Sequence, residues 1–143
     1  MSRLHTTPAT EATGELADLF GTIKRAMGKV PNAYATIGSN APAVLAQALQ
    51  TNGMLQTKSS LGKRELEAIN LAVSQESGCD YCVAAHTLAG KAAGYTLEQT
   101  RALRAGAYAE DTKIHALVQF ALSLCRPAAP CPLKCWSACA ALA

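Results

Sequence analysis

The sequence has few charged residues, no long apolar run and no leader-like N-terminus. Asp, Glu, Lys and Arg make up 16% of its 143 residues, against roughly 25% in a typical soluble domain. A monomer would have little charge to cover its surface, so we expect a homo-oligomer. No stretch approaches the roughly 18 apolar residues of a membrane span, and the first eight residues lack the apolar segment of a secretory signal. These absences predict a cytoplasmic protein with no membrane partner.

Clustered positive charge is also missing. The net charge is only +3 and the sequence pI is about 8.6. Lys and Arg are scattered along the chain, whereas a nucleic-acid-binding domain typically carries a basic patch or stripe. We therefore expect no nucleic-acid partner.

The third scarcity is of β-branched apolar residues, because Val and Ile together number nine while Ala and Leu dominate. This balance favours helix over strand. The length suits one domain, so the sequence predicts an all-α, single-domain bundle of about six helices over residues 1–125.

Capping residues, prolines and glycines give the boundaries of these helices. Thr7 and Pro8 have the pattern of an N-cap followed by a proline at the first helical position, and Gly78 suits a left-handed C-terminal cap. The segment beginning at Thr96 and running to Gln99 has the spacing of a capping box. The predicted helices span about residues 8–28, 42–55, 62–78, 79–94, 97–106 and 111–125.

The last 18 residues, 126–143, differ in composition from the rest. They contain three prolines, three cysteines and Trp136, with no acidic residue. One interpretation is a structural or metal-binding appendage, because Cys131, Cys135 and Cys139 recur every four residues and would share one helical face. The other is a poorly ordered or loosely packed tail, such as an out-of-frame reading of the coding sequence would produce.

The strongest chemical signal is the pair Cys79 and Cys82 at the start of a predicted helix, followed by His86. Residues three apart lie on one helical face, close enough for the sulfurs to form a disulfide with modest adjustment. A helix N-terminus favours thiolate over thiol. His86 lies one turn beyond Cys82, where an imidazole can accept the thiol proton. The pattern indicates redox chemistry.

Two other interpretations of these residues stay open. Buried cysteines are common as small apolar fillers in helical proteins. Cys79, Cys82 and His86 are also zinc-type ligands, with Cys125 or a tail cysteine as a fourth, although structural zinc sites more often show two cysteine pairs. If Cys79 and Cys82 instead form a disulfide, the expected cytoplasmic location favours a catalytic or redox-sensing one, because disulfides in the cytosol usually have such roles.

Glu67 is less telling from its spacing alone. Asn70 and Ser74 follow it on one polar strip beside the apolar face of the predicted helix, which favours a solvated carboxylate. Two further residues, Tyr81 and His115, are best interpreted as a packed aromatic and a structural histidine.

Taken together, Glu67, eleven intervening residues, the Cys79 to Cys82 pair and His86 resemble the signature of the alkylhydroperoxidase D-like group within the carboxymuconolactone decarboxylase family. The resemblance covers residues 60–125 and, more loosely, the segment around Pro31. It implies an all-helical fold and a trimer or hexamer.

The resemblance also implies roles for the residues. Cys82 is the peroxidatic nucleophile, oxidised to a sulfenic acid by an organic hydroperoxide, and Cys79 resolves it as a disulfide. His86 and Glu67 form the proton relay, with Glu67 pointing inward and a water between them. The implied activity is that of an alkyl hydroperoxide reductase-type peroxidase, an oxidoreductase whose disulfide is reduced by a lipoyl-type or thioredoxin-like dithiol. It requires neither cofactor nor metal.

Two alternatives to a peroxidase remain. A lyase resembling carboxymuconolactone decarboxylase would use Glu67 and His86 as acid and base but would not need two cysteines. A non-enzymatic redox sensor or zinc-binding helical oligomer is the other.

Overall fold

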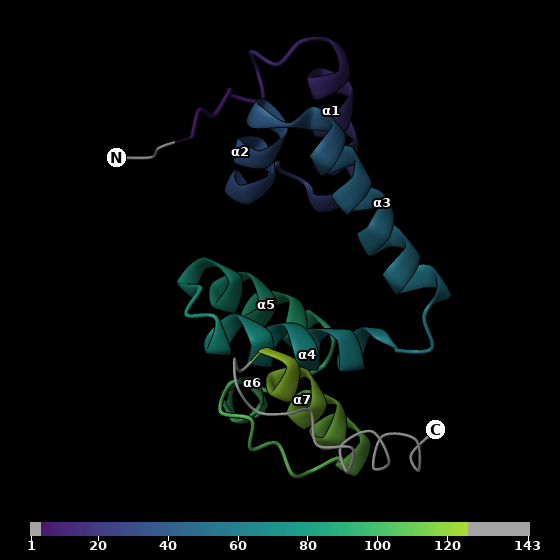
Figure 1. Cartoon of the computed structure of the whole chain (residues 1–143), viewed down its shortest axis with the longest axis vertical. Helices are drawn as coiled ribbons and strands as arrows, with labels where there is room; N and C mark the ends of the chain where they lie inside the picture. The colour runs from purple at the N-terminus through teal and green to yellow at the C-terminus, as the bar shows by residue number, and fades with distance from the viewer. Residues whose placement is uncertain (1–3, 126–143) are drawn as a thin grey trace. The chain divides into compact units, whose positions relative to one another are not determined.

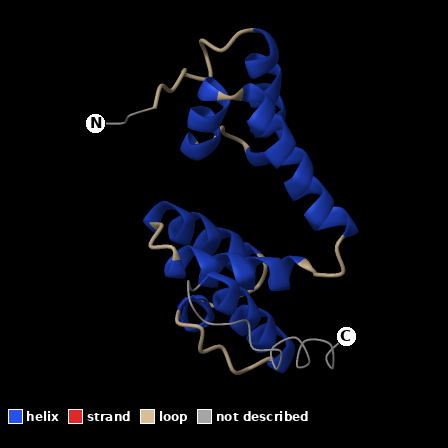
Figure 2. Cartoon of the chain, viewed as in Figure 1, coloured by secondary structure: helices blue, strands red, loops and turns tan. Residues whose placement is uncertain are grey.

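The computed structural model describes residues 4–125. Both interpretations of segment 126–143, including its three cysteines, concern residues outside this range. Within residues 4–125 all regular structure is helical and no strand occurs, as the sequence predicts (Figures 1 and 2). The chain divides between Ser59 and Ser60 into two compact units, and the expectation of one helical domain over residues 1–125 stays a prediction. We call them the N-terminal unit and the C-terminal unit.

The N-terminal unit is built from three helices around a small core. Phe20, Ile23 and Leu45 are buried. Gly38 lies so close to them that a Cβ added there would be 2.7 Å from the Leu45 side chain. A larger residue would therefore require these side chains to shift. The helices are α1 (Gly14–Met27), α2 (Asn32–Asn40) and α3 (Pro42–Lys58).

Two predictions for this unit are wrong. The first helix begins at Gly14 rather than near Pro8, and the Thr7 N–H donates to the Ser39 hydroxyl (2.8 Å). Helix α2 was not predicted at all, since Gly38 and the β-branched residues before it have poor helix propensity. The close contact that Gly38 makes with Leu45 explains why packing overrides propensity there.

Up to residue 125, the C-terminal unit contains four helices, of which α4 is the central one and packs against each of the other three. Its core is larger, and it includes three side chains with no exposed surface or almost none, Leu71, Leu103 and Val118. The capping box predicted at Thr96 and Gln99 is present. The helices are α4 (Lys63–Glu76), α5 (Asp80–Ala92), α6 (Leu97–Arg104) and α7 (Thr112–Cys125).

A buried tyrosine ties the start of α4 to the loop before α6. The Tyr95 hydroxyl donates to the Arg64 carbonyl (3.0 Å), and the Arg64 guanidinium lies 4.2 Å from the Tyr95 ring centroid. The Tyr108 ring meets Tyr95 edge-on at 5.9 Å. Burial raises the pKa of Tyr95 from 10.0 to about 12, although the nearby guanidinium opposes this shift. Tyr95 is therefore a neutral hydrogen-bond donor at physiological pH.

Between residues 4 and 125, no helix has both the length and the apolar character needed to cross a membrane.

Candidate active site

The cysteine pair is positioned by the turn that ends α4. The Gly78 N–H donates to the Gln75 carbonyl and the Cys79 N–H to the Ser74 carbonyl (both 3.1 Å), which is the Schellman pattern. Gly78 adopts the left-handed conformation (φ 65°), as predicted. This turn reverses the chain within three residues, so Cys79 lies where α5 begins.

Cys79 and Cys82 form a disulfide across the first turn of α5, with 5.3 Å between their Cα atoms. Cys79 is the N-cap residue of the helix, and its sulfur accepts a hydrogen bond from the Cys82 N–H (3.3 Å). Both cysteines are half-buried. The structure thus holds the two sulfurs in bonding contact at a helix N-terminus.

Glu67 and His86 meet across the interface between α4 and α5. The His86 Nδ1–H donates directly to Glu67 Oε2 at 2.8 Å, so the expectation of a water between them is wrong. The Glu67 side chain is 13% exposed and that of His86 is 33% exposed. The prediction of a solvated carboxylate, which the spacing favoured, is wrong, because the Glu67 side chain is turned toward α5. With Nδ1 bound to the carboxylate, the other ring nitrogen, Nε2, remains for proton transfer.

The residues around this pair are unevenly exposed. Ser74 is buried and Asn70 is half-buried, so the polar strip of α4 lies largely beneath the surface. Tyr81, expected as a packed aromatic, is 48% exposed.

His115 is structural as expected, because its Nδ1–H donates to the Tyr108 carbonyl (3.0 Å).

Thr87, the residue after His86, was missed by the sequence analysis. Its hydroxyl is buried and has no hydrogen-bond partner within the described part of the chain. No sequence signal marks this position, since a helical threonine ordinarily bonds a carbonyl one turn back or faces water.

The described residues do not contain the ligand cluster that a zinc site would need. Over residues 4–125, no three His, Cys, Asp or Glu side chains gather to hold a metal ion. Cys79 and Cys82 are joined to each other, and Cys125, considered as a fourth ligand, is a free, exposed cysteine.

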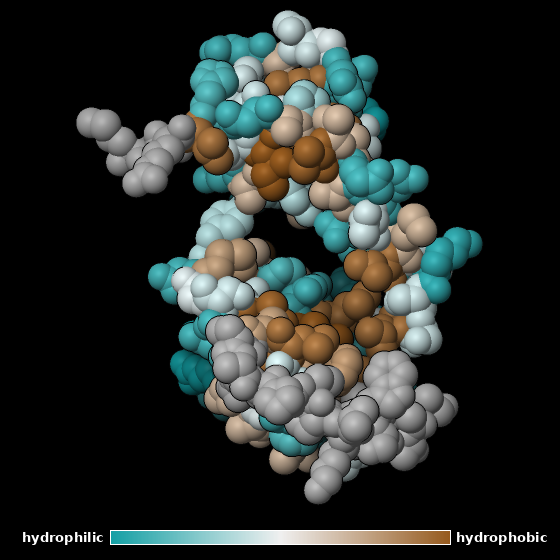
Figure 3. All heavy atoms as spheres, in the orientation of Figure 1, coloured by the Kyte–Doolittle hydropathy of each residue, from teal (hydrophilic) through white to brown (hydrophobic). Residues whose placement is uncertain are grey.

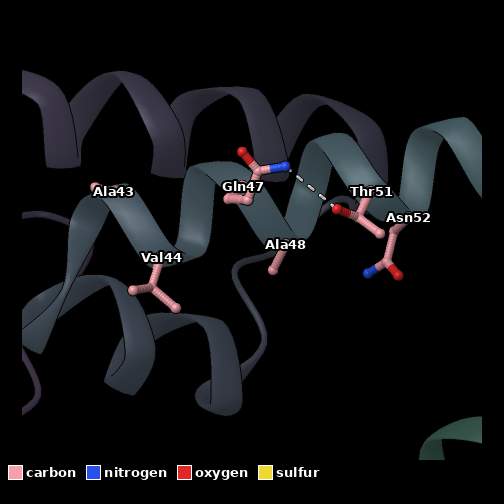
Figure 4. A pocket seen from close by; sticks show the side chains of 6 residues that line it. All are labelled: Ala43, Val44, Gln47, Ala48, Thr51 and Asn52. Carbon is pink, nitrogen blue, oxygen red and sulfur yellow. Dashed lines mark hydrogen bonds between the residues drawn. The ribbon is translucent and has the colours of Figure 1, made fainter.

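Two open surface hollows are lined by residues other than the candidate site residues. One, of about 570 Å³, lies along a single face of α3 and is shown in Figure 4. There Gln47 donates to the Thr51 hydroxyl (3.4 Å), and no titratable side chain lines the surface. The other, of about 500 Å³, is lined by Gln75, Arg101, Arg104 and Ala105. Neither is lined by Cys79, Cys82, His86 or Glu67.

Comparison with known proteins places the chain in a family. No curated protein matches it. The family model described as the carboxymuconolactone decarboxylase family matches residues 42–123, which is more than half of the chain and includes all four candidate site residues. The protein belongs to the carboxymuconolactone decarboxylase family.

Proposed function

We propose that this protein is a thiol-dependent peroxidase that reduces organic hydroperoxides through a cycle of the Cys79–Cys82 disulfide. The observation that carries the proposal is the disulfide at the N-terminus of α5 with the bonded Glu67 and His86 pair one turn away. An isolated acid–base pair would serve many reactions, and a lone disulfide could be structural. Their combination on two packed helices is suited to making a thiolate and cycling it.

The oxidative half of the cycle uses Cys82 as the nucleophile. Its thiolate attacks the distal oxygen of the hydroperoxide, the O–O bond breaks, and the alkoxide leaves as an alcohol after taking a proton. The resulting sulfenic acid condenses with the Cys79 thiol, which forms the disulfide and releases water. One hydroperoxide and two thiols thus give one alcohol, one water and one disulfide.

His86 and Glu67 supply the proton transfers. His86 accepts the thiol proton through Nε2, directly or through a water, while Glu67 holds the ring in place through its bond to Nδ1. The partly buried carboxylate keeps this pair together at 2.8 Å. General acid–base assistance of this kind contributes roughly 10²- to 10⁴-fold in rate.

Two partners belong to this proposal. The disulfide is reduced by an external dithiol of the lipoyl or thioredoxin-like type. The working form is a homo-oligomer, a trimer or hexamer, located in the cytoplasm.

Exposed apolar surface supports the oligomer. In α5 the residues at spacing i, i+3, i+4 and i+7 are all exposed and none is charged, with Tyr81 at one end and Leu88, 73% exposed, at the other. We call this the α5 stripe: Tyr81, Ala84, Ala85 and Leu88. Apolar side chains reach the surface of both units in Figure 3. Association with further copies would remove such surface from water.

Cysteine variants test the peroxidase. Cys82→Ser should abolish hydroperoxide consumption with a dithiol. Cys79→Ser should accumulate sulfenic or sulfinic acid on Cys82 after one equivalent of cumene hydroperoxide, detected by peptide mass spectrometry. Cys125→Ser is the matched control, because this free cysteine lies far along the chain at the end of α7, and it should keep wild-type turnover. An unmodified Cys82 in the Cys79→Ser protein would overturn the proposal.

The relay has its own test. Glu67→Gln should lower the turnover rate at neutral pH by roughly 10²-fold or more without unfolding the protein. Glu65→Gln is the matched control on the same helix, since Glu65 faces Lys113 (3.8 Å) rather than the histidine. Equal rates for the two variants would remove Glu67 from the mechanism.

A lyase is the second candidate, favoured by the name of the family. It would use Glu67 and His86 as acid and base and leave the cysteines idle. Activity on a lactone that survives Cys82→Ser but not Glu67→Gln would establish it in place of the peroxidase.

A further inference from the structure

One surface hollow of the C-terminal unit, of about 500 Å³, carries two positive charges. It lies where α4 and α6, which pack against each other, both end. Gln75 comes from α4, and Arg101, Arg104 and Ala105 come from the end of α6, so no acidic side chain of the described residues lines it. The two arginines are three positions apart, which places their guanidinium groups on one side of the helix.

The Arg104 guanidinium is oriented by a side chain from the other helix. Its Nε–H donates to Gln75 Oε1 at 2.9 Å, and Arg104 is half-buried. Its two terminal nitrogens have no hydrogen-bond partner among residues 4–125. A guanidinium held through Nε still presents parallel N–H groups that fit two oxygens of one anion. Arg104 is thus fixed in place with its strongest donors unused.

Arg101 is only weakly engaged. Its Nη1 lies 3.4 Å from Glu98 Oε1, and the two side chains are 64% and 75% exposed. An ion pair as exposed as this one contributes little, because water screens both charges. Arg101 can therefore turn toward an anion beside Arg104 at small cost.

Neither helix end needs these arginines as a cap. At the end of α6 the carbonyls of residues 101–103 accept the N–H groups of residues 105–107, and at the end of α4 those of residues 73–75 accept from residues 77–79. Basic side chains near a helix C-terminus often serve to bond its last carbonyls. Here backbone N–H groups already do so, which leaves the two guanidinium groups available for a ligand.

We propose that this hollow binds the phosphate group of a small-molecule phosphate monoester between Arg101 and Arg104. Such a group carries roughly −1.5 to −2 charges at pH 7, which balances two guanidinium groups, whereas a carboxylate balances one. The hollow, at about 500 Å³, is in the size range of small-molecule sites, roughly 300–1,000 Å³. A nucleic acid would need further cations along its backbone, but the other Lys and Arg residues are scattered.

The site is independent of the proposed peroxidase, and its test uses no peroxide. Two-dimensional ¹H–¹⁵N NMR of the full-length protein follows the Arg104 Nε–H and the backbone amides of α6 while inorganic phosphate replaces chloride at constant ionic strength. We expect these signals to shift and saturate, with a Kd on the order of 1 mM. Phenyl phosphate should bind at least as tightly and acetate more weakly. Shifts that do not saturate, or acetate binding as tight as phosphate binding, would overturn the proposal.

Variants connect the binding to the two arginines. Arg101→Gln and Arg104→Gln should each weaken phosphate binding roughly 10-fold or more, because each removes charge-assisted hydrogen bonds. Arg101 is exposed, so its variant keeps the fold even if Arg104→Gln does not, and the amide spectrum shows this directly. Arg25→Gln on α1 makes the same change of charge away from the hollow and should bind as the wild type does. An equal loss in Arg25→Gln and Arg101→Gln would contradict the assignment.

Discussion

The two units of the chain differ in the number of buried apolar side chains in their own cores. In the N-terminal unit three residues, Phe20, Ile23 and Leu45, form the buried core, and the last part of α3 is exposed along residues 51–58. In the C-terminal unit nine buried residues form the core, three of them on the central helix α4 and six from the segments packed against it. All four candidate site residues lie in the second unit. The proposed chemistry would thus depend on the unit with the larger buried core, which is better able to keep side chains at fixed distances.

The largest expected effects come from truncating one fully buried leucine in each unit. Leu71→Ala should cost about 2–5 kcal/mol, because it leaves a cavity in the core around α4. Leu45→Ala should lie at the lower end of that range, since its smaller core has fewer neighbours to lose and more freedom to collapse. Denaturant unfolding with hydrogen exchange would measure both. A Leu45→Ala protein that loses more stability than Leu71→Ala would break the comparison.

An intermediate effect should appear at high pH and only in the C-terminal unit. The pKa of Tyr95 is about 12 in the folded protein and 10.0 for the free group, so the fold binds the phenolic proton more tightly than the unfolded chain does. This contribution to stability is complete below pH 10 and disappears as the pH rises through about 12.

The free energy of unfolding, measured between pH 9 and 12, should therefore fall. Tyr95→Phe should be less stable at pH 9, because it lacks the hydrogen bond to the Arg64 carbonyl, but its stability should fall less over this interval. Identical slopes in the two proteins would show that Tyr95 is not the group responsible.

The smallest effects compare two threonines within the C-terminal unit. Thr87→Val should be neutral or slightly stabilising, because the hydroxyl it removes is buried without a partner. Thr100→Val should lose about 1 kcal/mol, because that buried hydroxyl donates to the Leu97 carbonyl at 2.7 Å. Thermal unfolding of both variants makes the test, and equal losses would mean that Thr87 has a partner after all.

Local signals predicted much of the C-terminal unit. The capping box at Thr96 and the left-handed glycine at position 78 are patterns of a few neighbouring residues, and both elements form where expected. Helix α2 could not be predicted in this way, because what stabilises it is the approach of Gly38 to side chains from other helices.

In the candidate site, too, features set by neighbouring residues could be predicted and features set by contacts between helices could not. The Cys79 and Cys82 spacing is local and predicted a pair within bonding reach. The inward orientation of Glu67 is not local, because its partner His86 comes from another helix 19 residues away. Periodicity on α4 alone placed Glu67 among polar residues and could not show which of them faced α5.

Gly78, in the turn between α4 and α5, determines the position of Cys79 at the start of α5. Its backbone lies in a region that costs an L-amino acid about 1–2 kcal/mol. A side chain introduced there would meet no other atom within 4 Å of its Cβ, so the strain would come from the backbone conformation alone. The peroxidase chemistry proposed for this protein therefore depends on a residue that takes no part in the reaction, because the turn that brings Cys79 to the start of α5 requires a glycine at position 78.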